Sequence, residues 1–392
     1  MEHIKIEQNS NVEVVDSNII HKLAEEAQDC DASSNMTGNL QTNKAFRSDV
    51  NFLTGKFPGL SINAQNYYID FADDEVSRVM NSNYGDGAGV TEAAAAAITS
   101  SNQNPFLLFR GNTEIETFDE LKYLTSIDTL YYSGAYYNPN GAFKGCTNLK
   151  SIDLTNVKKI GGGTFDGCSN LETVKNFHPI ELFIDSREQY QFLNCIKLSS
   201  IDLSSCTRIP GQCFKKCSNL ETIGSLSNVT FISDSAFADC NKLSLEIDLP
   251  LYINSDIGFA CFYNTKITGI KDLGQCSRIK GIVYDASLGW RCGAFALCTS
   301  LRYANLPATL TEIQVCSFHK DTALEYIKCL ATTPPTLGET DPTNENFPFY
   351  NTTCNFYVPD ASVNDYKAAS GWDGIASRIF PLSQFSTDFP NG

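Results

Sequence analysis

The chain has 392 residues, 42% of them hydrophobic and 19% charged, a composition typical of folded protein rather than of a disordered chain. Its 29 basic and 45 acidic residues give a net charge of −16, which argues against binding to nucleic acid through phosphate contacts and against binding to anionic membrane surfaces. The length exceeds that of one compact globule, so we expect several regions.

Residues 1–60 are predicted to form a small, mostly helical N-terminal segment. Apolar residues recur at helical spacing within Val12–Ala27, and Phe46–Leu53 predicts a second short helix that ends before Gly55 or Pro58. A polar stretch, residues 29–44, connects the two helices, and its composition is compatible with ordering on a partner.

Short amphipathic helices are marginal alone and need something to pack on. Two interpretations of residues 1–60 therefore stay open. The segment is either a small cap on the chain itself, or an attachment and assembly segment that contacts a partner and other copies of the chain. In the second interpretation the contact set consists of the apolar residues Ile19, Ile20, Leu23, Phe46, Val50 and Leu53.

Residues 61–125 predict a small α/β unit with a degenerate EF-hand-like loop. A strand at Ile62–Phe71 and a helix at Glu75–Met80 precede the loop around Gly85 and Gly87, and a run of alanines follows it. Calcium needs six or more oxygen ligands, and neither alignment of the loop supplies a full set or an acidic residue at the last position. We therefore expect no bound metal.

Residues 126–330 contain the motif Phe-x-x-Cys-x-x-Leu in six copies, which begin at Phe143, Phe165, Phe192, Phe214, Phe237 and Phe295. The undistorted copies recur every 22 or 23 residues, and longer gaps imply insertions. Two further copies, at Phe262 and Phe318, lack the cysteine. A fixed period in the twenties indicates a solenoid in which each repeat is one supersecondary unit.

The fold of one repeat follows from its residues. Phe143 and Cys146 are three apart, which suits a helical or 3₁₀ turn that buries both side chains. Ile152 and Leu154 alternate with polar residues, as in a half-buried strand. The expected fold is thus an α/β repeat, a solenoid of short strands and helical or 3₁₀ turns. Its outward strand positions are predicted to line one continuous polar face, which includes Ser151, Asp153, Ser200, Asp202 and Thr222.

Six of the 15 cysteines occupy the same inward position of the repeat, so we interpret them as buried thiols that fill the core. Local disulfides among the other cysteines stay open as an alternative: Cys206, Cys213, Cys261, Cys292 and Cys316. There is no Cys-x-x-Cys pair and there are only four histidines, which makes a structural zinc site improbable.

Two further segments adjoin the repeats. The tail, residues 331–392, begins at the pair Pro334–Pro335 and contains a predicted helix at Val363–Ser370, so we expect a C-terminal cap. A tyrosine-rich insertion interrupts the first repeat, and tyrosines are favoured at interfaces. Its candidate ligand or partner contacts are Tyr131, Tyr132, Tyr136 and Tyr137; the alternative is a packed junction with residues 61–125.

The repeats Gly141–Leu154 and Gly163–Val174, and the tail segments Tyr357–Val363 and Tyr366–Trp372, resemble the BspA-like leucine-rich repeat family. The resemblance covers roughly residues 110–385. It implies a curved leucine-rich repeat solenoid used in adhesion and binding at bacterial surfaces, without catalysis.

The front half carries a second resemblance. Phe71–Val76 and Phe109–Leu121 resemble a linker that precedes such repeats in proteins of gut Bacteroidetes and their tailed phages. Met1–Cys30 shows no apolar core of a signal peptide, and no stretch is long and apolar enough to span a bilayer. We therefore expect folding in a cytoplasm and no membrane insertion.

No set of residues in the sequence has the parts of an active site or of a cofactor site. The acidic pairs Asp73–Asp74 and Asp119–Glu120 sit where adjacent side chains diverge, unlike the carboxylate pair of a glycosidase. No phosphate-binding glycine loop occurs. We expect no catalytic residues, no cofactor and no metal.

The sequence therefore favours a non-enzymatic virion protein of fibre type, assembled in the host cytoplasm, whose solenoid binds host surface glycans or other virion proteins. We expect it to form homo-oligomers through residues 1–60. The alternative is a BspA-like adhesin on a bacterial cell surface.

Overall fold

The computed structural model describes residues 13–14, 17–28, 37–99, 108–130, 141–177, 181–182 and 189–389. The chain forms two compact units. The N-terminal unit consists of residues 1–108, 115–128 and 152–156, and the solenoid unit consists of residues 109–114, 129–151 and 157–392.

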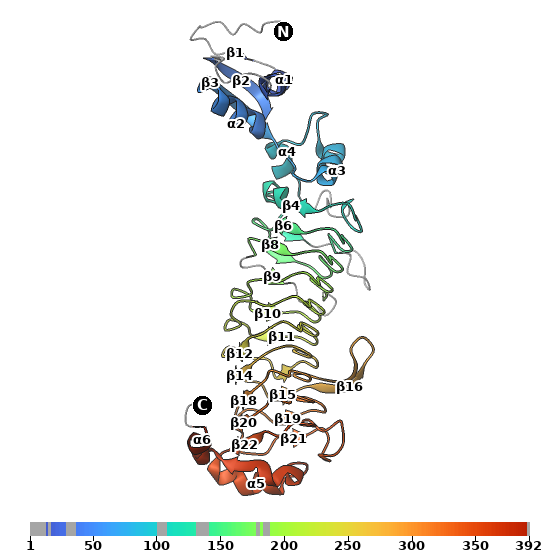
Figure 1. The fold of residues 1–392 in the computed structure, drawn as a ribbon, viewed down its shortest axis with the longest axis vertical. Coiled ribbons are helices and arrows are strands. Elements are labelled where there is room, and N and C mark those ends of the chain that lie inside the picture. The colour runs from blue at the N-terminus through green and yellow to red at the C-terminus, as the bar shows by residue number, and fades with distance from the viewer. Residues whose placement is uncertain are drawn as a thin grey trace. The chain divides into compact units, whose positions relative to one another are not determined.

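A parallel sheet forms the first part of the N-terminal unit. Its strands β1 (Glu13–Val14), β2 (Thr37–Phe46) and β3 (Gly59–Tyr68) lie in the order β1-β2-β3. Helix α1 (Ser17–Gln28) connects the first two strands, and helix α2 (Arg47–Lys56) connects the last two (Figure 1). The connections β1-α1-β2 and β2-α2-β3 both lead to the neighbouring strand on the same side. Because such crossovers are right-handed, both helices lie on one face of the sheet.

The two N-terminal helices agree with the sequence prediction, but the strand between them corrects it. The predicted polar connection at 29–44 is wrong for residues 37–44, which belong to β2 and pair with β3 along its whole length. The predicted boundary after residue 60 falls inside β3. The signal was missed because β2 is stabilised by pairing with a strand about 20 residues away, which local patterns do not report.

A helix–loop–helix forms the next part of the N-terminal unit, as predicted, with α3 (Asp74–Tyr84) and α4 (Glu92–Ala96). The Asp73 carboxylate caps α3 by accepting from two backbone N–H groups of its first turn, and it accepts from the backbone N–H of Glu116 at 2.6 Å. One buried carboxylate thus ties α3 to the chain before β4 (Thr117–Phe118) and the 3₁₀ helix η2 (Asp119–Tyr123).

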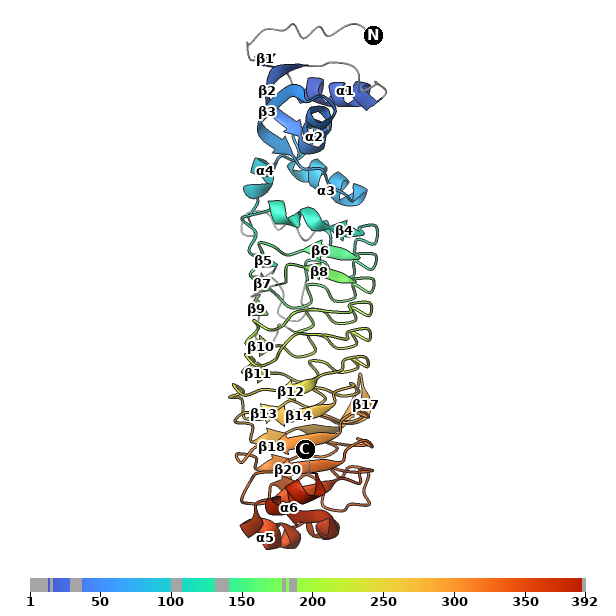
Figure 2. The ribbon, with the colours of Figure 1, turned by 60° about the vertical axis from the view of Figure 1, so that its left-hand side comes forward.

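Each repeat of the solenoid unit runs along a strand, crosses to a turn and returns (Figure 2). We call the column of longer strands the strand side: β6 (Ser151–Asp153), β8 (Thr173–Lys175), β12 (Glu246–Asp248), β14 (Gly269–Asp272), β18 (Tyr303–Leu306), β20 (Tyr326–Cys329), β22 (Asn355–Val358) and β23 (Ile379–Pro381). From β12 to β23 these strands form one parallel sheet in chain order.

A second column of two-residue strands stabilises the return path of each repeat. Its members are β5 (Thr129–Leu130), β7 (Lys159–Ile160), β9 (Glu181–Leu182), β10 (Arg208–Ile209), β11 (Phe231–Ile232), β13 (Asp256–Ile257), β15 (Arg278–Ile279), β19 (Glu312–Ile313) and β21 (Thr336–Leu337). They form three parallel sheets, β5-β7-β9, β10-β11 and β13-β15-β19-β21, in which for example Ile279 pairs with Ile313. The predicted α/β repeat solenoid is confirmed.

The Phe-x-x-Cys motif forms the turn side. The phenylalanine rings stack continuously from Phe109 to Phe349, with successive centroids 5.0–6.0 Å apart. In each turn the cysteine N–H donates to the phenylalanine carbonyl three residues earlier, as Cys146 does to Phe143 at 3.0 Å. This is the predicted 3₁₀-type turn, and the residue before the cysteine is left-handed, such as Gly145 and Asn194.

The six ladder cysteines are buried thiols, as predicted, and they also link the repeats. Each Sγ donates to the carbonyl of the phenylalanine one repeat earlier: Cys146 to Phe109, Cys168 to Phe143, Cys195 to Phe165, Cys217 to Phe192, Cys240 to Phe214 and Cys298 to Phe262, at 2.9–3.1 Å. Cysteine therefore suits this position because it packs as a small apolar group and still satisfies a buried acceptor.

Two additions interrupt or close the repeats. The gap between Phe262 and Phe295 holds an antiparallel hairpin, β16 (Gly281–Asp285) and β17 (Gly289–Gly293). At the C-terminal end, η3 (Asp360–Ser362), α5 (Val363–Ala368), η4 (Asp373–Arg378) and α6 (Leu382–Asp388) follow the last repeat. Trp372 is fully buried there and donates to the Pro335 carbonyl at 2.8 Å, so this helical segment packs onto the start of the tail at Pro334–Pro335.

Candidate functional site on the strand side

Burial and ion pairing shift the pKa values of the ladder thiols and of the two described histidines, His21 and His319. Burial raises the pKa of the ladder thiols, in Cys146 to about 12, whereas a catalytic cysteine needs a lowered pKa. His319 is 4% exposed, and burial lowers its pKa to about 4. His21 is bonded to Asp49 through Nδ1 at 2.8 Å, which raises its pKa.

The loop between α3 and α4 carries one carboxylate, that of Asp86, and other groups of the same chain bond to it. Asp86 forms an ion pair with Lys44 of β2 and accepts from the Tyr68 hydroxyl at 3.2 Å and from two backbone N–H groups of its own loop. The Lys44 ammonium holds the Asp86 pKa at about 2. Within the described ranges no three His, Cys, Asp or Glu side chains are grouped to hold a metal ion. The absence of calcium binding stays a prediction.

The six residues of the predicted N-terminal contact set are placed mainly in the core of the parallel sheet. Ile20, Leu23, Val50 and Leu53 are at most 7% exposed, and Ile19 is partly buried against them. Phe46 is half-buried, and its ring lies 4.9 Å from that of Tyr68. The contact set is therefore wrong as a surface, because these side chains hold α1 and α2 on the sheet.

The other predicted contacts cannot be placed. Tyr131, Tyr132, Tyr136 and Tyr137 lie outside the described residues. The predicted polar strand face is mixed. Ser200 and Thr222 are exposed, as expected, but Asp153 is only 6% exposed and accepts from the Thr155 N–H at 2.9 Å.

The ladder of the strand side is interrupted after β8. Thr173 of β8 donates its N–H to Lys150 of the preceding repeat at 3.1 Å, and Thr222 likewise donates to Ser199 of the repeat before it, but no strand pairing among the described residues joins β8 to the repeat of Ser200. β8 is the last strand of its sheet, and Ser200 forms an isolated bridge with Thr222. The step from Phe165 to Phe192 is 27 residues instead of 22 or 23, so an insertion separates these repeats.

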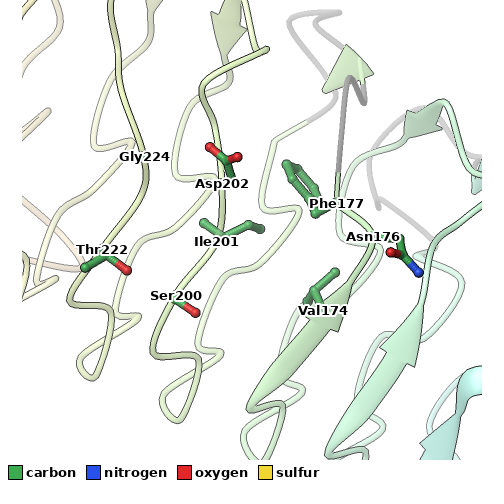
Figure 3. A pocket seen from close by; sticks show the side chains of 8 residues that line it. All are labelled: Val174, Asn176, Phe177, Ser200, Ile201, Asp202, Thr222 and Gly224. Carbon is green, nitrogen blue, oxygen red and sulfur yellow. The ribbon is translucent and has the colours of Figure 1, made fainter.

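A surface hollow of about 410 Å³ lies at this break, and Figure 3 shows its lining. Three consecutive repeats contribute: Val174, Asn176 and Phe177 from the first, Ser200, Ile201 and Asp202 from the second, and Thr222 and Gly224 from the third. The floor is apolar, since Phe177 and Ile201 are 7% and 5% exposed. The rim carries short amide, hydroxyl and carboxylate side chains that stay exposed.

Local packing fixes the geometry of this hollow. The Phe177 ring lies edge-on to Phe192 of the phenylalanine stack, with centroids 6.2 Å apart. Asp202 accepts from the N–H of Ser204 at 3.0 Å, and hydrogen bonds from Ser204 lower the Asp202 pKa, so its carboxylate is ionised. Gly224 has φ +70°, and a Cβ there would lie 2.3 Å from the Asp202 carboxylate oxygen. Glycine thus leaves room for this carboxylate.

The C-terminal part of the strand side is covered by the chain's own helix. Phe385 of α6 lies 4.7 Å from the Tyr326 ring and 5.1 Å from the Tyr357 ring. The Tyr357 hydroxyl donates to Asp388 at 2.6 Å. Beyond the helix, Tyr303 stacks on Tyr326 at 5.6 Å and its hydroxyl bonds to Glu246. The part of the strand side that α6 leaves uncovered therefore lies before β20.

Sequence reasoning identified Ser200, Asp202 and Thr222 as outward residues but did not bring them together with Asn176, Phe177 and Gly224. The 27-residue step was the available signal, because an insertion in a solenoid displaces one repeat from the next. Which side chains then meet depends on three repeats at once.

Comparison with known proteins gives one family match and several similar folds. A family model for the BspA type leucine-rich repeat region matches in six copies, over residues 137–268, 180–291 and 275–337. No curated protein matches the chain. None of the helices in the described part of the chain has the length and hydrophobicity needed to cross a membrane.

Two of the solved structures that match this chain come from bacteria. A leucine-rich cell surface protein from Faecalibacterium prausnitzii A2-165 is 15% identical, with 67% of this chain and 86% of that chain covered and a TM-score of 0.23. A leucine-rich repeat protein from Bacteroides ovatus ATCC 8483 is 17% identical, with 59% and 83% covered and a TM-score of 0.21.

Proposed function

The chain belongs to the BspA-type leucine-rich repeat family, and on this premise we propose that it is a non-enzymatic binding protein whose ligand docks on the strand side of the solenoid. The hollow at the break after β8 is the observation that carries the proposal. It combines an apolar floor with exposed polar groups. The repeated phenylalanines, by contrast, are buried and stack on one another inside the solenoid.

The chemistry of the hollow favours a hydroxylated ligand such as a surface glycan. Asn176, Ser200 and Thr222 offer donors and acceptors on short side chains, which lose little conformational entropy on binding. Asp202 adds an ionised acceptor for hydroxyl groups. Phe177 and Ile201 supply an apolar surface for the C–H face of a sugar ring. A net charge of −16 disfavours anionic ligands.

Glycan-array screening followed by calorimetry tests the site. We expect Asp202→Ala to weaken binding of a glycan hit by roughly tenfold, the value of one charge-assisted hydrogen bond. Asp248→Ala is the matched control, because Asp248 lies on the same side of the solenoid but outside the hollow. Equal losses in both variants, or none in Asp202→Ala, would place the ligand elsewhere.

The setting of this binding activity is the second part of the proposal. The first candidate is a fibre-type or other structural protein of a phage virion that infects gut Bacteroidetes, supported by the resemblance of Phe71–Val76 and Phe109–Leu121 to a linker found in such proteins. The second is a bacterial cell-surface adhesin, which the family match supports equally.

Peptide mass spectrometry distinguishes the two settings. A virion protein is expected in particles purified from infected cultures without detergent, at a stoichiometric copy number. An adhesin is expected in the outer-membrane fraction of uninfected cells. Detection in the second sample alone would contradict the virion setting and leave the binding site itself untouched.

A further inference from the structure

The strand β3 gives the N-terminal unit an open sheet edge. β3 is the terminal strand in the order β1-β2-β3, and β2 pairs with it on its other side from Thr37–Gly59 to Phe46–Tyr68. Among the described residues the outer edge makes one β-bridge, between Tyr68 and Thr91. The N–H of Ala93 also bonds the Asn66 side chain at 3.4 Å. These contacts occupy the C-terminal end of the edge, and no strand within the described ranges pairs with the edge at 59–65.

This edge lacks the features with which proteins prevent edge-to-edge pairing. Natural edge strands are commonly protected by lysine, proline, a bulge or short length. β3 is 10 residues long and runs Gly-Leu-Ser-Ile-Asn-Ala-Gln-Asn-Tyr-Tyr, with no charge and no proline. Its register with β2 runs from Thr37–Gly59 to Phe46–Tyr68 without a shift. The edge therefore presents a regular row of backbone donors and acceptors.

The occupant that fits this edge is a second copy of the chain. A copy carries a charge of −16, so self-association requires a surface without acidic side chains. Residues 59–65 supply such a surface. Their side chains also alternate strictly, with Leu60, Ile62 and Ala64 buried under the helices and Ser61 and Asn63 exposed on the opposite face.

We propose that β3 pairs antiparallel with β3 of a second copy about a two-fold axis at Ile62. This register places Ser61 opposite Asn63 of the other copy and Leu60 opposite Ala64, so apolar residues meet on the helix face and polar residues on the open face. The two sheets then join into one, with all helices on the same face. The inference stands apart from ligand binding by the solenoid.

Sedimentation velocity on the full chain tests the proposal with charge substitutions. Ser61→Lys with Asn63→Lys places two like-charged pairs directly across the axis, and we expect the dimer dissociation constant to rise by about tenfold. Gln41→Lys is the matched control, because Gln41 is exposed and lies beside Asn63 but on β2, one strand away from the edge. We expect its dissociation constant to stay within about twofold.

A charge-swap mixture separates direct pairing from a loss of folding. The glutamate counterpart, Ser61→Glu with Asn63→Glu, is expected to be monomeric alone and to form a mixed dimer with the lysine variant. Circular dichroism of each variant checks that the unit stays folded. Wild-type protein that stays monomeric up to roughly 100 µM, far above typical dissociation constants of specific complexes, overturns the proposal. So does a lysine variant that dimerises as well as the wild type, or a mixture that fails to associate.

Discussion

On the turn side of the solenoid, phenylalanine rings stack without interruption from Phe109 to Phe349, and each ladder thiol bonds the preceding repeat. On the strand side, the strand pairing is interrupted after β8, a hollow opens over three repeats, and α6 covers the last strands. The packing of the turn side is thus nearly the same in every repeat, whereas the strand side differs from one repeat to the next. Inward residues must match both neighbouring repeats, whereas outward residues meet solvent or a ligand.

The insertions follow the same division. The hairpin β16–β17 enlarges one repeat, yet Phe262 and Phe295 on either side of it still stack at 5.8 Å. The extra residues before Phe192 likewise leave its ring 5.0 Å from Phe165. The comparison teaches that the stack sets the fold, while the addition before Phe192 lies next in the chain to residues of the hollow that we propose as the binding site. The predictions below test this division, beginning with the largest expected effect.

Phe214→Ala is expected to destabilise the solenoid by about 3–5 kcal/mol, the usual cost of removing a buried aromatic ring. Phe214 is fully buried, and its ring lies 5.2 Å from Phe192 and 5.5 Å from Phe237. Chemical denaturation measures the free energy of unfolding. Phe231→Ala is the control, because Phe231 is half-buried and outside the stack. An equal loss in both variants would contradict the special role of the stack.

Asp321→Asn is expected to stabilise the solenoid at pH 7 by about 1–3 kcal/mol, because the amide is neutral at every pH whereas the buried carboxyl must take up a proton to become neutral. Asp321 takes the cysteine position of its repeat. It is fully buried, Oδ1 accepts from the Cys298 N–H at 2.8 Å, and Oδ2 has no partner among the described residues. Burial raises the Asp321 pKa well above 3.8, so the folded chain favours the protonated acid.

The sign of the pH dependence follows from linkage. A carboxyl with a raised folded pKa contributes its stability fully below the unfolded pKa near 3.8 and loses it as the pH rises toward the folded pKa. The advantage of Asp321→Asn should therefore be small near pH 4 and grow toward neutral pH. Melting temperatures of both proteins across this range check it, and parallel curves would refute a buried neutral acid.

Gly224→Ala is expected to cost about 1–2 kcal/mol, since an L-residue is strained in the left-handed region. The matched control is Gly111→Ala: Gly111 has φ +69° and open space around its Cβ position, whereas Gly224 has φ +70° and the Asp202 carboxylate 2.3 Å away. Backbone strain alone predicts equal losses. We expect a larger loss of stability in Gly224→Ala, because its new Cβ meets the Asp202 carboxylate. We also expect weaker ligand binding, because this contact would displace the carboxylate from its place in the hollow.

Thiol alkylation probes the turn side without changing stability. In the folded protein the ladder cysteines are expected to resist reagent, because burial raises their pKa and the thiolate is the reactive form. In denaturant without a reductant, all of them should react. Mass spectrometry of peptides containing Cys146, Cys168, Cys195, Cys217 and Cys240 gives the answer, and disulfide-linked pairs among them would contradict it.

By itself, the sequence determined the repeats, their buried phenylalanines and cysteines, and the C-terminal cap, because a motif repeated many times reports the same local constraint again and again. It did not predict the strand β2 or the burial of Leu23 and Val50 in the core of the N-terminal sheet. Nor did it predict that Phe177 and Asp202 line the same hollow. Only the tertiary structure decided these features, because each depends on a single contact between segments that are far apart in the chain. No sequence motif repeats at such a contact to reveal it. Helical spacing in α1 and α2 marks an apolar face, but whether that face meets a partner or the chain's own sheet depends on the pairing of β2 with β3.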